Sequence, residues 1–321
     1  MKANALLTKK LLPEAMEYLK KHIRYEVAGT DRYPTKKEII SGIKDKQGLV
    51  SLLVDQIDKE VINAAPHLKV IANCAVGYNN IDVFCATSKG IYVTNTPGVL
   101  TDTTADLTWA LLLSVARKIP QADRFTRQKK YKNWELDLFL GKDLEGKQLG
   151  IIGMGRIGKA VALRARPFKL KTVYSDPKKL TPEEEEKYEA RYLPLENLLK
   201  TSDIITIHAA LTKETHHLIS RKNIHLLKKQ AFLVNVSRGP VVEEKALAEA
   251  LERGDLWGAG LDVYEKEPEI EERLLSLDNV VLLPHIGSAS YETRAQMSMM
   301  AAKNLVCVLS GKKPLNPVNK I

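Results

Sequence analysis

The stretch Leu149–Gly158, with the sequence LGIIGMGRIG, decides the fold of this chain. Its apolar beginning predicts a short buried strand. Glycines follow at positions 153, 155 and 158 and open a helical pattern that continues to Phe168. A second apolar strand, Thr172–Tyr174, leads to an acidic residue, Asp176. This order of strand, glycines, helix, second strand and acid is the fingerprint of a dinucleotide-binding fold.

Each part of the fingerprint has a physical role. Gly153 permits a tight turn, Gly155 lets the backbone approach a pyrophosphate, and Gly158 lets the helix pack on the strand. The helix N-terminus offers free N–H groups and the positive end of a dipole to the phosphates. A carboxylate at Asp176 accepts hydrogen bonds from the ribose hydroxyls and repels a 2′-phosphate, so NAD(H) is predicted in preference to NADP(H). The alternative is a turn in an α/β domain that binds no cofactor.

The place of the fingerprint in the chain predicts two domains. The glycine stretch normally opens the first strand of its domain, so the first ~99 residues must form a separate one. They alternate apolar strands with helices, which predicts a small parallel sheet. The strands are expected at Ala5–Leu7, Gly48–Val54, Lys69–Cys74 and Ile91–Thr94, and then near 149–152, 172–175, 204–208, 231–236, 257–261 and 280–283. The predicted fold class is therefore α/β with two parallel-sheet domains.

Two long helices are expected outside this alternation. Residues 101–118 form one, which Ile119-Pro120 should end, and its broad apolar face must be buried in the core or against another subunit. This face leads us to expect a homodimer. Tyr291–Leu309 forms the other, after the last strand of the second domain, and it could pack back on the first domain.

Composition excludes several classes of partner. The net charge of +10 comes from scattered pairs such as Lys9-Lys10, interleaved with acidic residues, so no nucleic acid is expected. The three cysteines have no metal-binding spacing and no disulfide pattern, and no metal is expected. The N-terminus lacks the apolar stretch of a signal peptide, and no apolar run is long enough to cross a membrane. These features predict a cytoplasmic protein.

Charged residues follow three of the predicted strands of the second domain. Arg238 follows residues 232–237, Asp262 and Glu267 follow residues 258–261, and His285 follows residues 280–284. Ligands of open parallel sheets bind beyond the carboxyl ends of the strands, so these side chains should meet at one edge. A guanidinium suits a carboxylate, and an imidazole suits proton transfer to a carbonyl oxygen. With nicotinamide, this set could reduce a 2-oxo acid.

An ordinary surface or structural role is the alternative for each of these residues. A single arginine usually forms a surface ion pair, and a single histidine is usually a satisfied surface or core residue. That ordinary role is the interpretation adopted for the histidines with no such position, namely His22, His67, His216, His217 and His225.

At these residues the chain resembles the D-isomer-specific 2-hydroxyacid dehydrogenases. The segments that carry the resemblance are Asn235–Pro240 around the arginine, Leu261–Pro268 around the acids, Leu283–Ala289 around the histidine, and Val76–Asp82 and Thr104–Leu107 upstream. The resemblance covers nearly the whole chain. It implies a Rossmann NAD-binding domain over residues 100–286, and a smaller flavodoxin-like substrate domain over residues 1–99 and 287–321. It places the active site in the cleft between them.

The resemblance also implies residue roles. Arg238 binds the substrate carboxylate and carbonyl, His285 is the general acid or base, and Glu267 pairs with His285. Backbone N–H groups at Val76 and Gly77 hold the substrate carboxylate. Asp262 holds the nicotinamide carboxamide. The other residues implied at the cofactor are Thr104, Gly153, Gly155, Arg156, Ile157, Gly158, Asp176, His208, Ala209, Thr212, Val236, Ser237, Gly287 and Ser288.

Within the family, the pattern is most similar to glyoxylate and hydroxypyruvate reductases. Asn133–Gly141 resembles their segment with a tryptophan that reaches the neighbouring subunit's site, although Trp134 could equally be a packing residue. Ala210 stands where the family usually has proline, so the adenine-side loop could be looser. Phosphoglycerate dehydrogenase, a D-lactate-type dehydrogenase and a dinucleotide-sensing corepressor are the alternatives. Formate dehydrogenase is disfavoured because it lacks the acid present here at Glu267.

Overall fold

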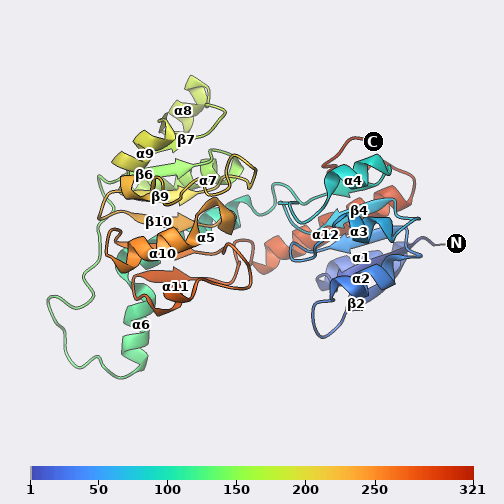
Figure 1. The fold of residues 1–321 in the computed structure, drawn as a ribbon, viewed down its shortest axis with the longest axis horizontal. Coiled ribbons are helices and arrows are strands. Elements are labelled where there is room, and N and C mark those ends of the chain that lie inside the picture. The colour runs from blue at the N-terminus through green and yellow to red at the C-terminus, as the bar shows by residue number, and fades with distance from the viewer. Residues whose placement is uncertain (1) are drawn as a thin grey trace. The chain divides into compact units, whose positions relative to one another are not determined.

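The computed structural model describes residues 2–321 and divides into two compact units. Unit 1 comprises residues up to 100 together with 288–321, and unit 2 comprises residues 101–287. Each unit is built on one sheet in which all paired strands are parallel (Figure 1). The prediction of two parallel-sheet α/β domains is therefore confirmed.

Unit 1 holds a five-stranded sheet in the order β2-β1-β3-β4-β5. Its strands are β1 Asn4–Lys9, β2 Arg24–Gly29, β3 Gly48–Ser51, β4 Val70–Asn73 and β5 Tyr92–Thr94. Its helices are α1 Pro13–His22, α2 Lys36–Ile43, α3 Lys59–Asn63, α4 Val83–Ser88 and α12 Tyr291–Leu309.

Alternate side chains of this sheet fill two cores. Leu6, Leu49 and Ile71 pack with α2, α3 and α4 on one face, and Leu7 and Val50 pack with α1 and α12 on the other. The last helix, α12, thus returns from the end of unit 2 to pack on α1, β3 and β4 of unit 1. Both faces of the sheet are covered, which is why its strands are apolar on both sides.

Unit 2 holds a seven-stranded sheet in the order β12-β11-β10-β9-β6-β7-β8. Its strands are β6 Gln148–Ile152, β7 Lys171–Ser175, β8 Ala190–Tyr192, β9 Ile204–Ile207, β10 Phe232–Asn235, β11 Gly258–Leu261 and β12 Val280–Leu282. Its α-helices are α5 Thr101–Arg117, α6 Ile119–Arg127, α7 Arg156–Ala165, α8 Pro182–Tyr188, α9 Leu195–Thr201, α10 Glu244–Glu252 and α11 Glu272–Ser276. Short 3₁₀ helices lie at η1 Arg166–Phe168, η2 Ile224–Leu226 and η3 Gly239–Val241.

The strand order reverses at β6, which lies between β9 and β7. Such a reversal is a topological switch point, where ligands of this fold class bind beyond the strand ends. Helices α5 and α7 cover one face of the sheet through Trp109, Leu112 and Val161, and α9 and α10 cover the other through Leu198 and Leu251. The apolar face of α5 is therefore buried within its own unit.

The structure corrects some local predictions. Ile119-Pro120 ends α5 but also begins α6, because Lys118 takes a left-handed conformation (φ 53°) and turns the chain. Proline is tolerated in the first turn of a helix, where its missing N–H needs no partner. The polar strand β2 and the short strand β8 lack a clear apolar run and were not expected.

Candidate active site

The predicted catalytic side chains follow three neighbouring strands of unit 2. Arg238 comes after β10, Glu267 after β11 and His285 after β12, and these strands lie side by side in parallel. Their carboxyl ends share one edge of the sheet, which is also the edge of the glycine stretch after β6. The topology thus gathers the arginine, acid and histidine segments in one region.

His285 and Glu267 are in direct contact. The Nδ1 atom of His285 lies 2.8 Å from Oε2 of Glu267, and Oε1 accepts a hydrogen bond from the N–H of Tyr264 at 3.1 Å. Burial acts to raise the pKa of Glu267, but the hydrogen bond and charge of His285 outweigh it, so the net pKa is lowered. Glu267 is therefore ionised at neutral pH. His285 has a left-handed backbone (φ 54°), a conformation that non-glycine residues adopt mostly at constrained sites.

Arg238 is held in the same region. Burial lowers the pKa of its guanidinium, and the charge of Glu267 partly restores it. Nη1 donates to the carbonyl of Ser237 at 2.7 Å, and the side chain of Asn235 supports the turn by donating to the carbonyl of Arg238. Asn235 also accepts from the N–H and hydroxyl of Ser237, so β10 leads into a rigid turn. A partly desolvated guanidinium on a fixed turn is suited to bind a carboxylate.

Asp262 fixes the histidine segment. It is fully buried, and its two oxygens accept hydrogen bonds from the N–H groups of Ile286 and Gly287, both at 2.7 Å. Burial raises its pKa, and these hydrogen bonds act against the rise. Thr104 on α5 donates to the carbonyl of Gly287 at 3.0 Å, so α5 also contacts this segment. The predicted contact of Asp262 with a carboxamide stays a prediction.

The glycine stretch has the geometry of a phosphate cradle. Gly153 has φ +92°, and a Cβ there would come within 2.6 Å of the backbone nitrogen of Ala209, so only glycine fits. A Cβ at Gly155 would meet nothing within 4 Å, which leaves open space ahead of α7. At Gly158 a Cβ would clash with the carbonyl of Gly153, so the helix packs against the turn. Open space at the N-terminus of a ten-residue helix fits a pyrophosphate.

Asp176 joins β7 to the glycine stretch. One carboxylate oxygen accepts from the N–H of Met154 and the other from the N–H of Lys178, each at 2.8 Å. The carboxylate is thereby fixed at the carboxyl end of β7, beside the strand that carries the glycines. Arg156 and Ile157 form the first turn of α7, as the predicted pyrophosphate contact requires.

His208 and Ala209 follow β9, on the other side of β6. The Nε2 atom of His208 lies 2.9 Å from the hydroxyl of Thr206, and Nδ1 is buried with no partner among residues 2–321. Burial lowers the pKa of His208 to about 3, so its ring is neutral at pH 7. An unpaired polar atom beside the glycine stretch is a second feature that fits a bound dinucleotide. Thr212 is exposed further along the same loop.

Other predicted residues lie elsewhere. Val76 and Gly77 follow β4 in unit 1, where Asn95 and Asn73 donate to their carbonyls at 2.8 and 2.9 Å. Ser288 begins the second segment of unit 1. Val236 is buried beside Ser237 at the end of β10. Trp134 is 76% exposed in the loop after α6, so it is not a packing residue of its own chain.

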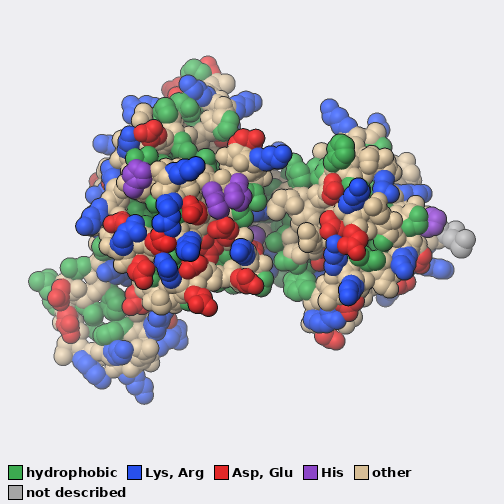
Figure 2. Space-filling model, viewed as in Figure 1, with side chains coloured by type: hydrophobic (Ala, Val, Ile, Leu, Met, Phe, Trp, Pro, Cys, Tyr) green, Lys and Arg blue, Asp and Glu red, His purple; other side chains and the backbone are tan. Residues whose placement is uncertain are grey.

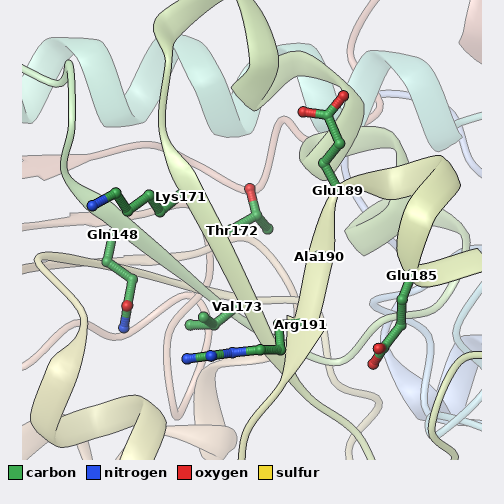
Figure 3. A pocket seen from close by; sticks show the side chains of 8 residues that line it. All are labelled: Gln148, Lys171, Thr172, Val173, Glu185, Glu189, Ala190 and Arg191. Atoms are coloured by element: carbon green, nitrogen blue, oxygen red, sulfur yellow. The ribbon is translucent and has the colours of Figure 1, made fainter. Parts of the chain in front are cut away.

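A pocket of about 480 Å³ lies at the opposite edge of the sheet (Figure 3). It opens where β6, β7 and β8 begin, and contains none of the predicted site residues. Lys171 and Arg191 balance Glu185 and Glu189 in its lining, so it offers no net charge to a ligand. Figure 2 likewise shows basic and acidic side chains intermixed on the face it presents. No helix among residues 2–321 is long and apolar enough to cross a membrane.

One histidine outside the predicted site contacts the loop that carries Glu267. His217, which was assigned an ordinary role, has its Nε2 atom 2.8 Å from Oε1 of Glu265, two residues before Glu267. The sequence contains no strand or motif that joins the two positions, so only the folded chain reveals the pair.

Comparison with known proteins agrees with this arrangement. Residues 109–287 match the family described as D-isomer specific 2-hydroxyacid dehydrogenase, NAD binding domain. The chain is 47% identical to a glyoxylate reductase of Thermococcus litoralis, an alignment that covers 100% of this chain and 98% of the relative.

Solved structures extend the likeness to the whole fold. The TT0316 protein of Thermus thermophilus superimposes with a TM-score of 0.92 at 43% identity, covering 98% of this chain and 100% of that one. An NADPH-dependent glyoxylate/hydroxypyruvate reductase of Sinorhizobium meliloti, solved with NADP and malonate, has a TM-score of 0.87 at 32% identity, covering 99% and 97%. The chain therefore belongs to the family of D-isomer-specific 2-hydroxyacid dehydrogenases and contains the NAD-binding domain of that family.

Proposed function

We propose that this protein reduces a small 2-oxo acid, glyoxylate or hydroxypyruvate, to glycolate or D-glycerate with NADH. The observation that carries the proposal is the 2.8 Å contact of His285 with an ionised Glu267, at the strand edge that also holds Arg238. It combines a proton donor, its charge partner and a carboxylate-binding cation. The curated relatives that are 44–47% identical carry the name glyoxylate reductase, which supports the choice of substrate.

The residues divide the work of reduction. Arg238 binds the substrate carboxylate and polarises the carbonyl, and the N–H groups at Val76 and Gly77 bind the same carboxylate. The Nδ1 atom of His285 is engaged by Glu267, which leaves Nε2 to give a proton to the substrate oxygen. Glu267 favours the protonated imidazole before transfer. Nicotinamide, when bound, supplies the hydride for C2 of the substrate.

We propose NAD(H) as the preferred cofactor. The fixed carboxylate of Asp176 accepts hydrogen bonds from ribose hydroxyls and repels a 2′-phosphate. Gly153, Gly155 and Gly158 cradle the pyrophosphate with Arg156 and Ile157. The remaining contacts proposed for the cofactor come from Thr104, His208, Ala209, Thr212, Val236, Ser237, Arg238, Asp262, His285, Gly287 and Ser288.

We also propose that the protein acts as a homodimer in the cytoplasm. Tyr131, Trp134, Leu136 and Leu140 are all more than half exposed in the loop after α6, which an isolated chain leaves in water. Figure 2 shows apolar side chains in the region where Figure 1 places α6 and this loop. A second copy that covers them brings Trp134 to the partner's active site. The three cysteines are free thiols, which suits a reducing compartment.

The test is a kinetic panel that follows loss of NADH absorbance with glyoxylate, hydroxypyruvate, pyruvate and phosphohydroxypyruvate. We expect the highest kcat/KM for glyoxylate or hydroxypyruvate. A clear preference for phosphohydroxypyruvate indicates a phosphoglycerate dehydrogenase, and a preference for pyruvate indicates a D-lactate-type enzyme. Tight binding of NADH without turnover of any of the four acids indicates a dinucleotide sensor.

A further inference from the structure

The loop that carries Glu267 is fixed at its beginning by a reciprocal set of hydrogen bonds. The N–H of Glu265 donates to Oε2 of Glu244 at 2.7 Å, and the N–H of Glu244 donates to Oε2 of Glu265 at 3.1 Å. Glu244 is buried at the start of α10 and also accepts from the N–H of Glu271 at 2.6 Å. Each carboxylate thus accepts a hydrogen bond from the backbone N–H of the other residue where α10 begins.

His217 supplies a side-chain partner to Glu265. Its Nε2 atom lies 2.8 Å from Oε1 of Glu265, and about a third of the His217 side chain is exposed to solvent. Burial acts to raise the pKa of Glu265, while the hydrogen bond from His217, the N–H of Glu244 and the charges of His217 and His216 lower it overall. Glu265 is therefore ionised at neutral pH, and the imidazole of His217 is its side-chain partner.

His217 is itself held firmly in place. Its backbone is left-handed (φ 52°), and its N–H donates to the carbonyl of Pro240 at 2.8 Å. Ile219 then donates to the carbonyl of Val241, so this segment runs beside the turn that follows Arg238. The ring of His216 stacks on that of His217 with centroids 4.0 Å apart. The backbone of His217 is therefore bonded to the turn that follows Arg238.

The turn that follows Arg238 (the arginine turn, residues 238–241) and the loop that carries Glu265 and Glu267 (the acidic loop, residues 262–268) are in close backbone contact. A Cβ at Gly239 would overlap the carbonyl group of Tyr264, so no side chain fits between the two segments. Tyr264 also donates its N–H to Glu267 and its hydroxyl to the carbonyl of Leu283 at 2.8 Å, two residues before His285. Glu265 therefore directly follows the residue whose N–H bonds Glu267.

We propose that His217 and Glu265 form a positioning pair that fixes the acidic loop and thereby sets the geometry of the Glu267–His285 contact. The inference rests on the proposed function for its catalytic consequence, but not for its structural part. His217 touches neither substrate nor cofactor in this role. It acts through Glu265, the Tyr264 peptide and Glu267, and it links the segments that carry Arg238, Glu267 and His285.

The test compares His217→Asn with the matched control His216→Asn. Asparagine tolerates the left-handed backbone at position 217 but is too short to reach Glu265. His216 is the exposed neighbour; its backbone N–H donates to the carbonyl of Thr212, and the hydrogen bond to Glu265 comes from His217. We expect His217→Asn to lower kcat for reduction on the order of tenfold. KM for NADH should change little, and His216→Asn, which removes only the ring that stacks on His217, should lower kcat much less.

A double-variant cycle with Glu267→Gln shows whether the effect of His217 is transmitted through Glu267 or is independent of it. If His217 acts through Glu267, both single variants move the upper limb of the pH profile for reduction to lower pH, and the double variant moves it no further than Glu267→Gln alone. Equal effects of His217→Asn and His216→Asn, or additive effects of His217→Asn and Glu267→Gln, overturn the proposal. His217→Gln, which can still donate to Glu265, should restore part of the lost rate.

Hydrogen exchange separates failure of this inference from failure of the proposed function. We expect the amides of Tyr264 and Glu265 to exchange faster in His217→Asn than in wild type or His216→Asn, with or without any turnover. Unchanged exchange refutes the positioning pair even if the enzyme reduces glyoxylate. Faster exchange in a protein that reduces none of the tested acids supports the pair and removes only its catalytic consequence.

Discussion

At the scale of single residues, the contact of Glu267 with His285 is the part of the proposed mechanism most open to test. The carboxylate of Glu267 is ionised because contact with His285 outweighs the effect of burial on its pKa. Glu267→Gln keeps shape and hydrogen bonding but removes the charge that favours the imidazolium. Since we propose that reduction starts from protonated His285, the upper limb of the kcat/KM profile for reduction should move to lower pH in this variant.

The reverse reaction provides the internal control. In the proposed mechanism, oxidation of the hydroxy acid needs neutral His285. The lower limb of the pH profile for oxidation should therefore move in the same direction in Glu267→Gln. Both profiles are to be measured at saturating cofactor for both proteins. If neither limb moves, Glu267 does not affect the protonation of His285, and the pair has no role in catalysis.

Arg238 gives the second prediction at this scale. Arg238→Lys keeps a positive charge but loses the planar fork that matches a carboxylate. We expect a higher KM for glyoxylate and a lower kcat, with kcat/KM reduced roughly 10²-fold, the size of effect seen when one transition-state donor is removed. Binding of NADH, measured by fluorescence titration, should be nearly unchanged. Wild-type kinetics in this variant would contradict the role assigned to Arg238.

At the scale of elements, the connection of β7 to the glycine stretch is the feature on which the proposed preference for NAD(H) depends. Asp176 bonds the N–H of Met154 and the N–H of Lys178, so its carboxylate has a fixed place. Asp176→Ala removes the repulsion of a 2′-phosphate and leaves Lys178 and Lys179 nearby. We expect the ratio of kcat/KM for NADH to that for NADPH to fall by about tenfold or more. A wild-type enzyme that already prefers NADPH would show that this role of Asp176 is wrong.

At the scale of the whole molecule, the exposed apolar loop after α6 is the contact that we propose for a second copy of the chain. Trp134, Leu136 and Leu140 are 76%, 79% and 60% exposed. We expect sedimentation to give a dimer at micromolar concentration. We also expect Trp134→Ala to raise KM for the 2-oxo acid, because we propose that the tryptophan reaches the partner's active site. Leu113→Ala, a change at a half-buried residue of α5 that packs against the core of the same unit, is the control for general loss of stability. A wild-type monomer would refute both parts of the prediction.

The sequence by itself determined the fold class of this protein and the family to which it belongs. Apolar runs bounded by glycine and proline predicted most of the strands, because strands buried on both faces must be apolar throughout. The glycine stretch could be recognised as a tight turn between a strand and a helix, because only glycine fits a backbone such as that of Gly153, with φ +92°. Elements without an apolar run, such as β2 and β8, were missed, since neighbouring strands stabilise them.

The tertiary structure alone decided which side chains meet. His285 and Glu267 follow different strands, and their 2.8 Å contact depends on the pairing of β11 with β12. The pair of His217 and Glu265 joins positions 48 residues apart through two loops, and no local pattern encodes such a contact. Periodicity specifies the path of the backbone within each element. Contacts between loops depend on how several elements pack at once, and for that reason they emerge only in the folded chain.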